Sequence, residues 1–187
     1  MPDRFTLDTL ADLPPEARPL AQRVLEVSSD GIGGPFNLLL KSPQSGAKIV
    51  DLLDHFNGGF SRIDSDSRRL AVLILARSAG ARYAWWTHER RAIAAQQFSP
   101  DQIAALNNKQ RPLGLTPRLN AVFDYVTALN RGTPTPAATL AALQSEMSEA
   151  EIVDLILFCG LYTTIALLLN EGDVALPEGA HDSLKRD

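Results

Sequence analysis

The sequence predicts an all-α protein, for two reasons. Apolar residues recur at the three- and four-residue spacing of helices along most of the chain, and clusters of glycine and proline separate these stretches. No segment alternates apolar and polar residues with the β-branched enrichment that is typical of a strand. We therefore expect a bundle of helices without a sheet.

Each expected helix is bounded by residues that start or stop helices. Ser42-Pro43, Asp64 and Ser99-Pro100 are typical helix starts, and Ser148 has the capping-box spacing with Glu151. Glycine pairs or single glycines follow most of the periodic stretches and end them. The expected helices, in chain order, cover residues 16–27, 43–55, 68–79, 83–96, 100–106, 118–130, 137–146 and 149–169.

Two of these helices are unusually apolar. Residues 70–75 are almost continuously apolar, so this helix is expected to be buried on most sides. The run from Ile152 to Leu169 is interrupted by Asp154, Thr163 and Thr164, and on this ground we do not expect a membrane span. Three parts of the chain follow from the pattern: an irregular lead-in over 1–15, a single helical domain over 16–177 and a solvated tail over 178–187.

The composition limits the classes of function. The chain has 187 residues, of which 45% are hydrophobic and 21% charged, as in an average globular domain. A net charge of -4 without a basic cluster argues against nucleic acid as a partner. The N-terminus lacks the layout of a signal peptide, and the single cysteine cannot form an internal disulfide, so we expect a cytoplasmic protein.

Common catalytic motifs are missing from the sequence. The glycines at 31–34 lack the lysine of a phosphate-binding loop, and no nucleophile elbow is present. His55, His88 and His181 are too scattered for a metal-ligand spacing, so no metal is expected. Cys159 lies in an apolar run and is interpreted as a buried core thiol.

The segment before and around His88 carries the most specific signal. Helical spacing places one histidine, one tryptophan and three alanines on a single face: Ala81, Ala84, Trp85, His88 and Ala92. The alanines leave room, Trp85 supplies an apolar wall, and His88 is titratable near neutral pH. A small recess that binds a ligand is one interpretation. The other is a core histidine that is hydrogen-bonded to a backbone carbonyl.

This arrangement resembles the carboxymuconolactone decarboxylase and alkylhydroperoxidase D-like superfamily. The resemblance rests on the buried helix with arginines, the turn at Gly80, the helix with His88, and the last helix, and it covers about residues 15–178. Peroxidase members carry two cysteines three residues apart, and these fall on Ala81 and Ala84. Thiol peroxidase chemistry requires a thiolate, so the resemblance implies the cysteine-free branch.

That branch implies a lyase or isomerase that needs no cofactor and acts on a small unsaturated lactone or an acid from aromatic compound catabolism. His88 is then the expected catalytic acid, base or oxyanion partner, and Tyr83 a hydrogen-bond donor. The expected substrate-binding residues are Trp85, Trp86, Arg77, Arg82 and Glu89, the last of which alternatively orients His88 or pairs with an arginine. A homo-oligomer, either a trimer or a hexamer, is also implied. The alternative function is a non-catalytic protein that binds a small molecule or acts as a scaffold.

Overall fold

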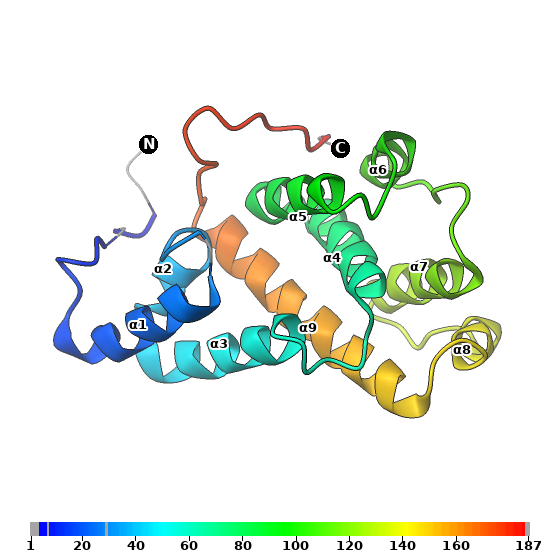
Figure 1. The fold of residues 1–187 in the computed structure, drawn as a ribbon, viewed down its shortest axis with the longest axis horizontal. Helices are drawn as coiled ribbons and strands as arrows, with labels where there is room; N and C mark the ends of the chain where they lie inside the picture. The colour runs from blue at the N-terminus through cyan, green and yellow to red at the C-terminus, as the bar shows by residue number, and fades with distance from the viewer. Residues whose placement is uncertain (1–3, 7, 29, 186–187) are drawn as a thin grey trace.

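The computed structural model describes residues 4–6, 8–28 and 30–185, and within these all regular secondary structure is helical, as predicted (Figure 1). No strand occurs in these ranges. A short 3-10 turn over Pro15–Ala17 precedes the first α-helix. The α-helices are α1 (Arg18–Val27), α2 (Phe36–Leu39), α3 (Pro43–Asn57), α4 (Ser65–Ala79), α5 (Arg82–Ala94), α6 (Pro100–Asn107), α7 (Pro117–Leu129), α8 (Ala137–Gln144) and α9 (Glu149–Glu171).

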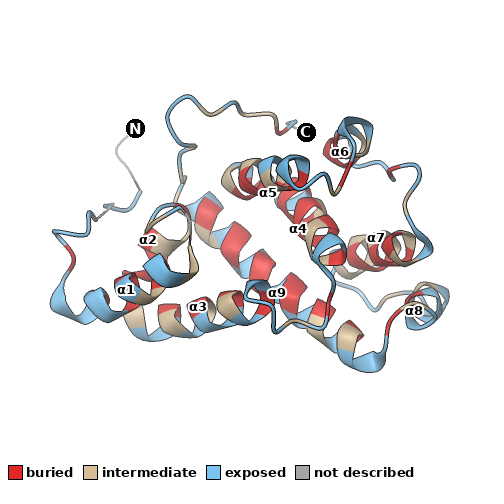
Figure 2. Ribbon diagram, viewed as in Figure 1, coloured by how far each residue is buried: buried red, intermediate tan, exposed pale blue. Residues whose placement is uncertain are grey.

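Helix α4 lies at the centre of the molecule, packed against α5, α7 and α9 (Figures 1 and 2). Its apolar run was predicted to be buried on most sides, and Leu70, Val72 and Leu73 are at most 2% exposed. Asp64 caps its first turn by accepting a hydrogen bond from the Ser67 backbone N–H, and Gly80 ends it in the left-handed conformation. The strongest sequence signals therefore mark the centre of the fold.

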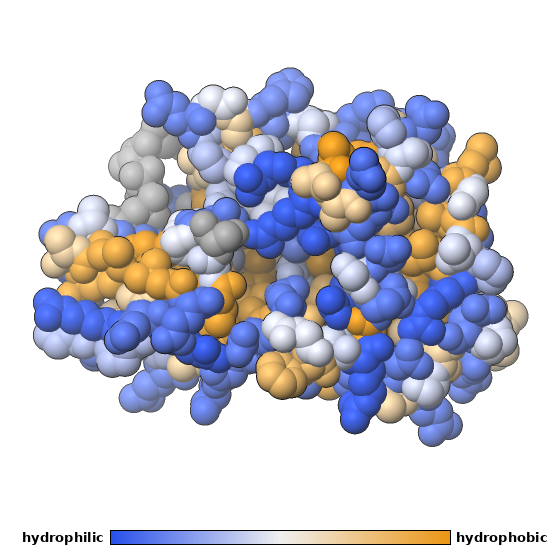
Figure 3. All heavy atoms as spheres, viewed as in Figure 1, coloured by the Kyte–Doolittle hydropathy of each residue, from blue (hydrophilic) through white to orange (hydrophobic). Residues whose placement is uncertain are grey.

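The first three helices form a second, smaller hydrophobic cluster beside the main core. Gly46 of α3 faces α1 and the end of α2, where a Cβ would lie 2.5 Å from the Leu39 carbonyl oxygen and 2.8 Å from the Leu20 side chain. Only glycine permits this close approach. Phe36, Ile49 and Leu168 pack against both clusters and join them. Hydrophobic residues also show on the surface over these N-terminal helices, at the left of Figure 3.

Arg118, at the start of α7, connects the starts of three helices. Its guanidinium donates to the Asp64 carboxylate at 2.8 Å, to Glu151 of α9 at 2.6 Å and to the Glu146 carbonyl oxygen at 2.5 Å. The hydrogen bonds from Arg118 and Ser148 lower the pKa of Glu151 to about 2. Both capping residues of the long helices, Asp64 and Glu151, are thus held by one arginine.

The C-terminal segment differs from the solvated tail that was predicted. Leu184 is buried in the main core, and Asn107 of α6 donates to the Ser183 carbonyl oxygen at 2.7 Å. The Ser183 hydroxyl accepts a hydrogen bond from the Trp85 indole N–H at 3.0 Å. The sequence pattern missed this because the contact is made by one apolar residue and a few hydrogen bonds rather than by a periodic stretch.

Helix α9 also departs from the expectation drawn from its polar interruptions. The helix runs through them, and by length and composition it is long and apolar enough to cross a membrane. Thr163 and Thr164 bond to carbonyls of their own helix, and Asp154 pairs with Arg62, so none of them breaks it. In this fold, 56% of the most apolar window of α9 is buried. The core helix of a folded domain has the same apolar composition.

Replacement of Asp64 tests the role of the cap on α4. Asp64→Ala removes an N-cap that also neutralises Arg118, and we expect it to lower the free energy of unfolding by about 2 kcal/mol. Asp101→Ala is the matched control, because Asp101 is an exposed acid in the first turn of α6 that is not its N-cap. Chemical denaturation of both variants measures the difference, and equal losses would contradict the cap assignment.

Candidate functional site

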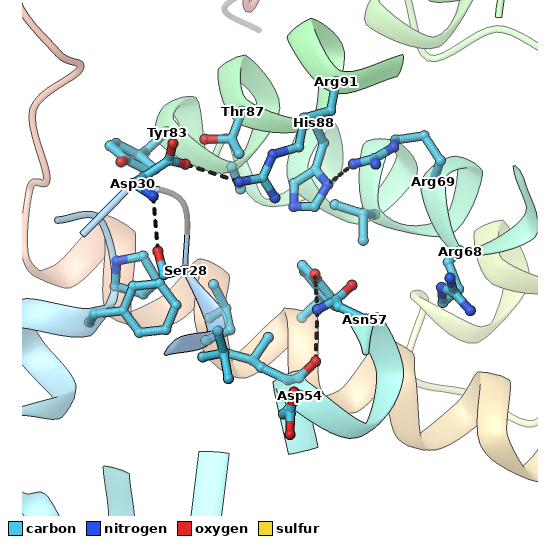
Figure 4. Close-up of a pocket in the computed structure, with 18 of the residues that line it drawn as sticks. Ser28, Asp30, Asp54, Asn57, Arg68, Arg69, Tyr83, Thr87, His88 and Arg91 are labelled. Atoms are coloured by element: carbon cyan, nitrogen blue, oxygen red, sulfur yellow. Dashed lines mark hydrogen bonds and ion pairs between the residues drawn. The ribbon is translucent and has the colours of Figure 1, made fainter. Parts of the chain in front are cut away.

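A pocket of about 480 Å³ lies between the two hydrophobic clusters (Figure 4). This volume is in the range of sites for small organic ligands. The loop over residues 30–35, the C-terminal end of α3, the first turns of α4, and the inner faces of α5 and α9 line it. The polar side chains at its wall include Asp30, Asp54, Asn57, Arg68, Arg69, Tyr83, Thr87, His88, Arg91 and Tyr162.

His88 and Arg69 form a close polar contact at the pocket wall, with 2.5 Å between the Arg69 Nη1 and the His88 Nδ1 (Figure 4). A guanidinium can only donate, so Nδ1 accepts and the imidazole proton is on Nε2. No described residue bonds to Nε2. His88 therefore offers an N–H donor, rather than a lone pair, to a ligand in the pocket.

The same contact fixes the charge state of His88. The side chain is buried, and burial together with the positive charges of Arg69 and Arg91 lowers its pKa well below the ordinary value of 6.5. The imidazole is neutral at physiological pH. The core-histidine alternative is correct about burial, but the partner of His88 is an arginine and not a backbone carbonyl.

The charges around the pocket do not balance locally. Asp54 is paired with Arg23 at 2.5 Å, and Asp30 with Arg91 at 3.0 Å. Arg69 donates only to neutral partners, His88 and the Gln97 side-chain oxygen, and it forms no ion pair within the described residues. Burial lowers the pKa of Arg69, which marks its guanidinium as incompletely solvated. A partly desolvated cation without a carboxylate partner favours an anionic ligand beside it.

Arg68 adds a second cation to this side of the pocket. Its guanidinium donates to the Ile63 carbonyl oxygen and forms no ion pair with any described residue. It follows Asp64 by four residues in the first turn of α4, but the carboxylate of Asp64 is held by Arg118. The N-terminal end of α4 thus presents two adjacent arginines to the pocket.

Three hydroxyl groups lie around the same cavity. Tyr162 is buried, its ring meets His88 edge to face at 5.3 Å, and its hydroxyl accepts a long hydrogen bond of 3.5 Å from Asn57. Burial raises its pKa and that of Tyr83, so both phenols keep their protons. The Thr87 hydroxyl is buried at the pocket wall without a hydrogen-bond partner among the described residues.

Of the residues predicted for the site, His88 and Tyr83 lie in this pocket together. Tyr83 is on the side of Arg91 and Asp30, and its ring lies against Gly34, where a Cβ would come within 2.7 Å of it (Figure 4). Gly34 has a positive φ of 62°, which glycine adopts without strain. The loop therefore closes tightly over the Tyr83 ring at one end of the cavity.

The two tryptophans do not line the pocket. Trp85 is fully buried and faces the C-terminal segment through its bond to Ser183. Trp86 stacks under the guanidinium of Arg90 at 4.7 Å and meets Tyr83 edge to face at 5.8 Å. Their expected role in shaping the pocket is corrected accordingly: Trp86 supports Tyr83, and Trp85 anchors the chain end.

The charged residues that were expected to bind the substrate also lie outside this pocket. Arg77 is buried on another side of α4, where it donates to the Asn107 carbonyl oxygen at 2.7 Å and borders a separate cavity of about 220 Å³. Arg82 pairs with Asp182 at 2.9 Å, and Glu89 accepts a hydrogen bond from Ser183. Neighbouring helix residues point about 100° apart, so Glu89 cannot share the direction of His88 and does not orient it.

No group of three histidine, cysteine or acidic residues in the described part of the chain lies close enough to hold a metal ion. His55 and His181 are exposed. Cys159 is buried, which raises the pKa of its thiol to about 12, in keeping with the core interpretation.

No protein-family model matches this sequence, and no curated protein is significantly similar to it.

Sequence reasoning missed Arg69, Tyr162, Asn57 and Thr87. The Arg68-Arg69 pair at the start of the most buried helix was a usable signal, because arginine is costly to bury without a function. Tyr162 was recognisable only as a phenol within an apolar run. Asn57, Arg69 and Tyr162 are each far from His88 in sequence, and only the fold brings them together.

The neutral state of His88 predicts how stability depends on pH. The unfolded chain binds a proton near the ordinary pKa of 6.5, whereas the folded chain does so only well below it. Stability from this residue is complete above about pH 6.5 and falls below it by up to about 1.4 kcal/mol per pH unit. His88→Gln keeps an acceptor for Arg69 but does not titrate, so it removes this slope.

Chemical denaturation between about pH 5 and 7.5 measures the effect. His55→Gln is the matched control, because His55 is an exposed histidine outside the pocket. It is expected to keep the wild-type slope. A wild-type slope in His88→Gln would mean that the imidazole is not buried in its neutral form.

Proposed function

We propose that the protein is a carboxymuconolactone decarboxylase-like enzyme of the cysteine-free branch that acts on a small unsaturated lactone or related organic acid without a cofactor. The observation that carries the proposal is the Arg69–His88 contact in a pocket of ligand size. In this contact, the Arg69 cation has no carboxylate partner. The imidazole of His88 directs its N–H away from that cation.

The charge distribution supports an anionic substrate. Arg68 and Arg69 supply positive charge at the N-terminal end of α4, while the acids across the pocket are already paired. Apolar side chains, among them Val72, Phe158 and Ile165, form the rest of the wall. A small acid with an unsaturated ring matches both parts of this lining.

The proposed chemistry uses His88 as an electrophile. When the bond to the departing carboxylate breaks, carbon dioxide leaves and its electron pair moves through the conjugated ring onto the lactone carbonyl oxygen. The Nε2–H of His88 donates to this oxygen, and Arg69, which donates to Nδ1, draws electron density out of the imidazole and so strengthens Nε2–H as a donor. Negative charge moves toward His88 and Arg69 during the reaction, so they stabilise the transition state more than the substrate.

The reaction is completed by a proton that replaces carbon dioxide on carbon. Tyr162 is the best-placed donor, because its hydroxyl is protonated and its ring contacts His88. The phenolate that remains takes a proton from water, which restores the hydroxyl. Tyr83, at the other end of the pocket, is the second phenol and supports the substrate by a hydrogen bond. An isomerase differs only in that a proton, rather than carbon dioxide, leaves the substrate.

The proposal extends to the fold family, the assembly and the compartment. We propose the alkylhydroperoxidase D-like variant of the helical bundle, a homo-oligomer, and a cytoplasmic protein with a small molecule as its partner. Ala81 and Ala84 occupy the positions of the peroxidase cysteines, and both are buried. A thiol peroxidase is not proposed, since Cys159 is buried with a raised pKa and alanine has no thiol.

The experiment is the release of carbon dioxide from 4-carboxymuconolactone by chelator-treated protein. The wild type is expected to turn over, and His88→Ala to lower kcat by about 10²–10³-fold, the usual loss for an oxyanion donor. His55→Ala is the control and should retain full activity, because His55 lies on the surface. Circular dichroism checks that each variant is folded.

Two results would overturn the proposal in different ways. Binding of the lactone without release of carbon dioxide supports the alternative of a non-catalytic binding protein. Turnover that is equal in the wild type and in folded His88→Ala would place the chemistry on other residues.

A further inference from the structure

A second cavity, of about 220 Å³, lies between α4, α6 and α7. Helices α6 and α7 are at the right of Figure 1, and both contact α4. The cavity is bordered by Ile74 and Arg77 of α4, Leu106 of α6, and Phe123 and Thr127 of α7. We call it the α7 cavity.

The α7 cavity is separate from the pocket of His88. No described residue lines both of them. Ser65 lines the pocket and Ile74 the α7 cavity, and the nine residues between these positions turn the helix by about two and a half turns. The two cavities are therefore on opposite sides of α4, and a ligand in one does not touch the other.

The charged groups at the wall of the α7 cavity are all positive. Arg77, Lys109 and Arg131 line it, and no acidic residue in the described part of the chain does so. Asp124, which follows Phe123 in α7, is paired with Arg111 outside the cavity. A wall with positive charges of one sign beside apolar groups favours an anionic ligand.

The hydroxyl of Thr127 is a polar group that still needs a partner. It is buried and forms no hydrogen bond within the described ranges. A helical threonine can bond to the carbonyl four residues before it, as Thr163 and Thr164 do in α9. A buried hydroxyl without any partner costs free energy. Because Thr127 lines the α7 cavity, an acceptor atom of a ligand there would remove this cost.

The size and the apolar part of the wall indicate an organic ligand. Ile74, Leu106 and Phe123 form the apolar part. A cavity of about 150 Å³ is enough for benzene. The α7 cavity, at about 220 Å³, therefore admits a six-membered ring with one small charged group. An inorganic anion alone would leave the apolar side chains uncovered.

The walls of the α7 cavity are fixed by hydrogen bonds. Arg77 is buried, and its Nε donates to the Asn107 carbonyl oxygen at 2.7 Å. The Asn130 side chain donates to the Ser78 hydroxyl at 2.6 Å, which ties the end of α7 to the end of α4. A site whose walls are already ordered loses less entropy when it binds a ligand.

We propose that the α7 cavity is a second binding site, which takes a small organic anion with an apolar ring and one carboxylate. The ring lies against the apolar part of the wall. The carboxylate accepts a hydrogen bond from the Thr127 hydroxyl and lies near the positive charge of Arg131. Phe123, Thr127 and Arg131 follow one another at four-residue spacing, so the apolar, hydroxyl and charged groups succeed each other along one side of α7.

Benzoate is the probe, and NMR spectra of the backbone amides of the full-length protein locate where it binds. We expect benzoate to shift the amide signals of Ser78 and Thr127, which line the α7 cavity. Binding in the pocket of His88 is read separately from the amide of Thr87. The result at the α7 cavity is therefore independent of whether the proposed activity is confirmed.

Variants test the groups that hold the carboxylate. Thr127→Val removes the hydroxyl and keeps the shape of the side chain, and we expect it to weaken benzoate binding at the α7 cavity about 5–10-fold. Arg131→Gln should weaken it in the same direction. Lys48→Gln is the matched control and should change nothing, because Lys48 is an exposed cation of α3 that lines neither cavity. Arg69→Gln should affect binding only in the pocket of His88.

Two further probes test the two parts of the ligand. Benzamide has the ring without the charge, and inorganic phosphate has the charge without the ring. We expect each to bind at the α7 cavity at least about 10-fold more weakly than benzoate. Equal binding of either one would overturn the proposed ligand class. Unshifted Ser78 and Thr127 amides at millimolar benzoate, or unchanged affinity in folded Thr127→Val, would overturn the site itself.

Discussion

Burial of α4 is the constraint on which the rest of the fold depends. A helix that is apolar on nearly every side must be covered on nearly every side, and α5, α7 and α9 supply that cover. Its first turn is the exception, because two arginines follow the cap at Asp64. The helix that is most completely removed from water thus begins with the charges that define the pocket.

Packing against α4 also explains why His88 is held in one state. Helix α5 lies beside α4, so its inward histidine meets Arg69 instead of solvent or a carboxylate. The guanidinium excludes a proton from Nδ1, and burial excludes a second proton from the ring. The chemistry available to His88 is therefore decided by helix packing as much as by the residue itself.

Much of the fold could be predicted from the sequence because its helix ends have local causes. The caps at Asp64, Ser99 and Ser148, together with the stop at Gly80, act within one turn and are visible in a short stretch of sequence. The buried face with Ala84, Trp85 and His88 follows equally from periodicity. In contrast, the docking of Ser183 on Trp85 joins residues that are distant in sequence and leaves no local pattern.

The candidate site was predictable only in part, for a related reason. Periodicity places His88 and the tryptophans near each other, but it does not say which of them faces a cavity and which faces another helix. Trp85 turned out to face the chain end, and Arg77 a different side of α4. The partners that give His88 its state come from α4 and α9, so the periodicity of α5 alone does not identify them.

The position of the pocket at the seam between two hydrophobic clusters has a consequence for the energetics of the whole chain. The smaller cluster of α1, α2 and α3 is joined to the larger by a few shared side chains, such as Phe36 and Leu168. A molecule bound in the seam touches both clusters and adds its contacts to that joint. A bound ligand therefore makes the two clusters unfold together. Without a ligand, the N-terminal helices can unfold first, as a separate unit.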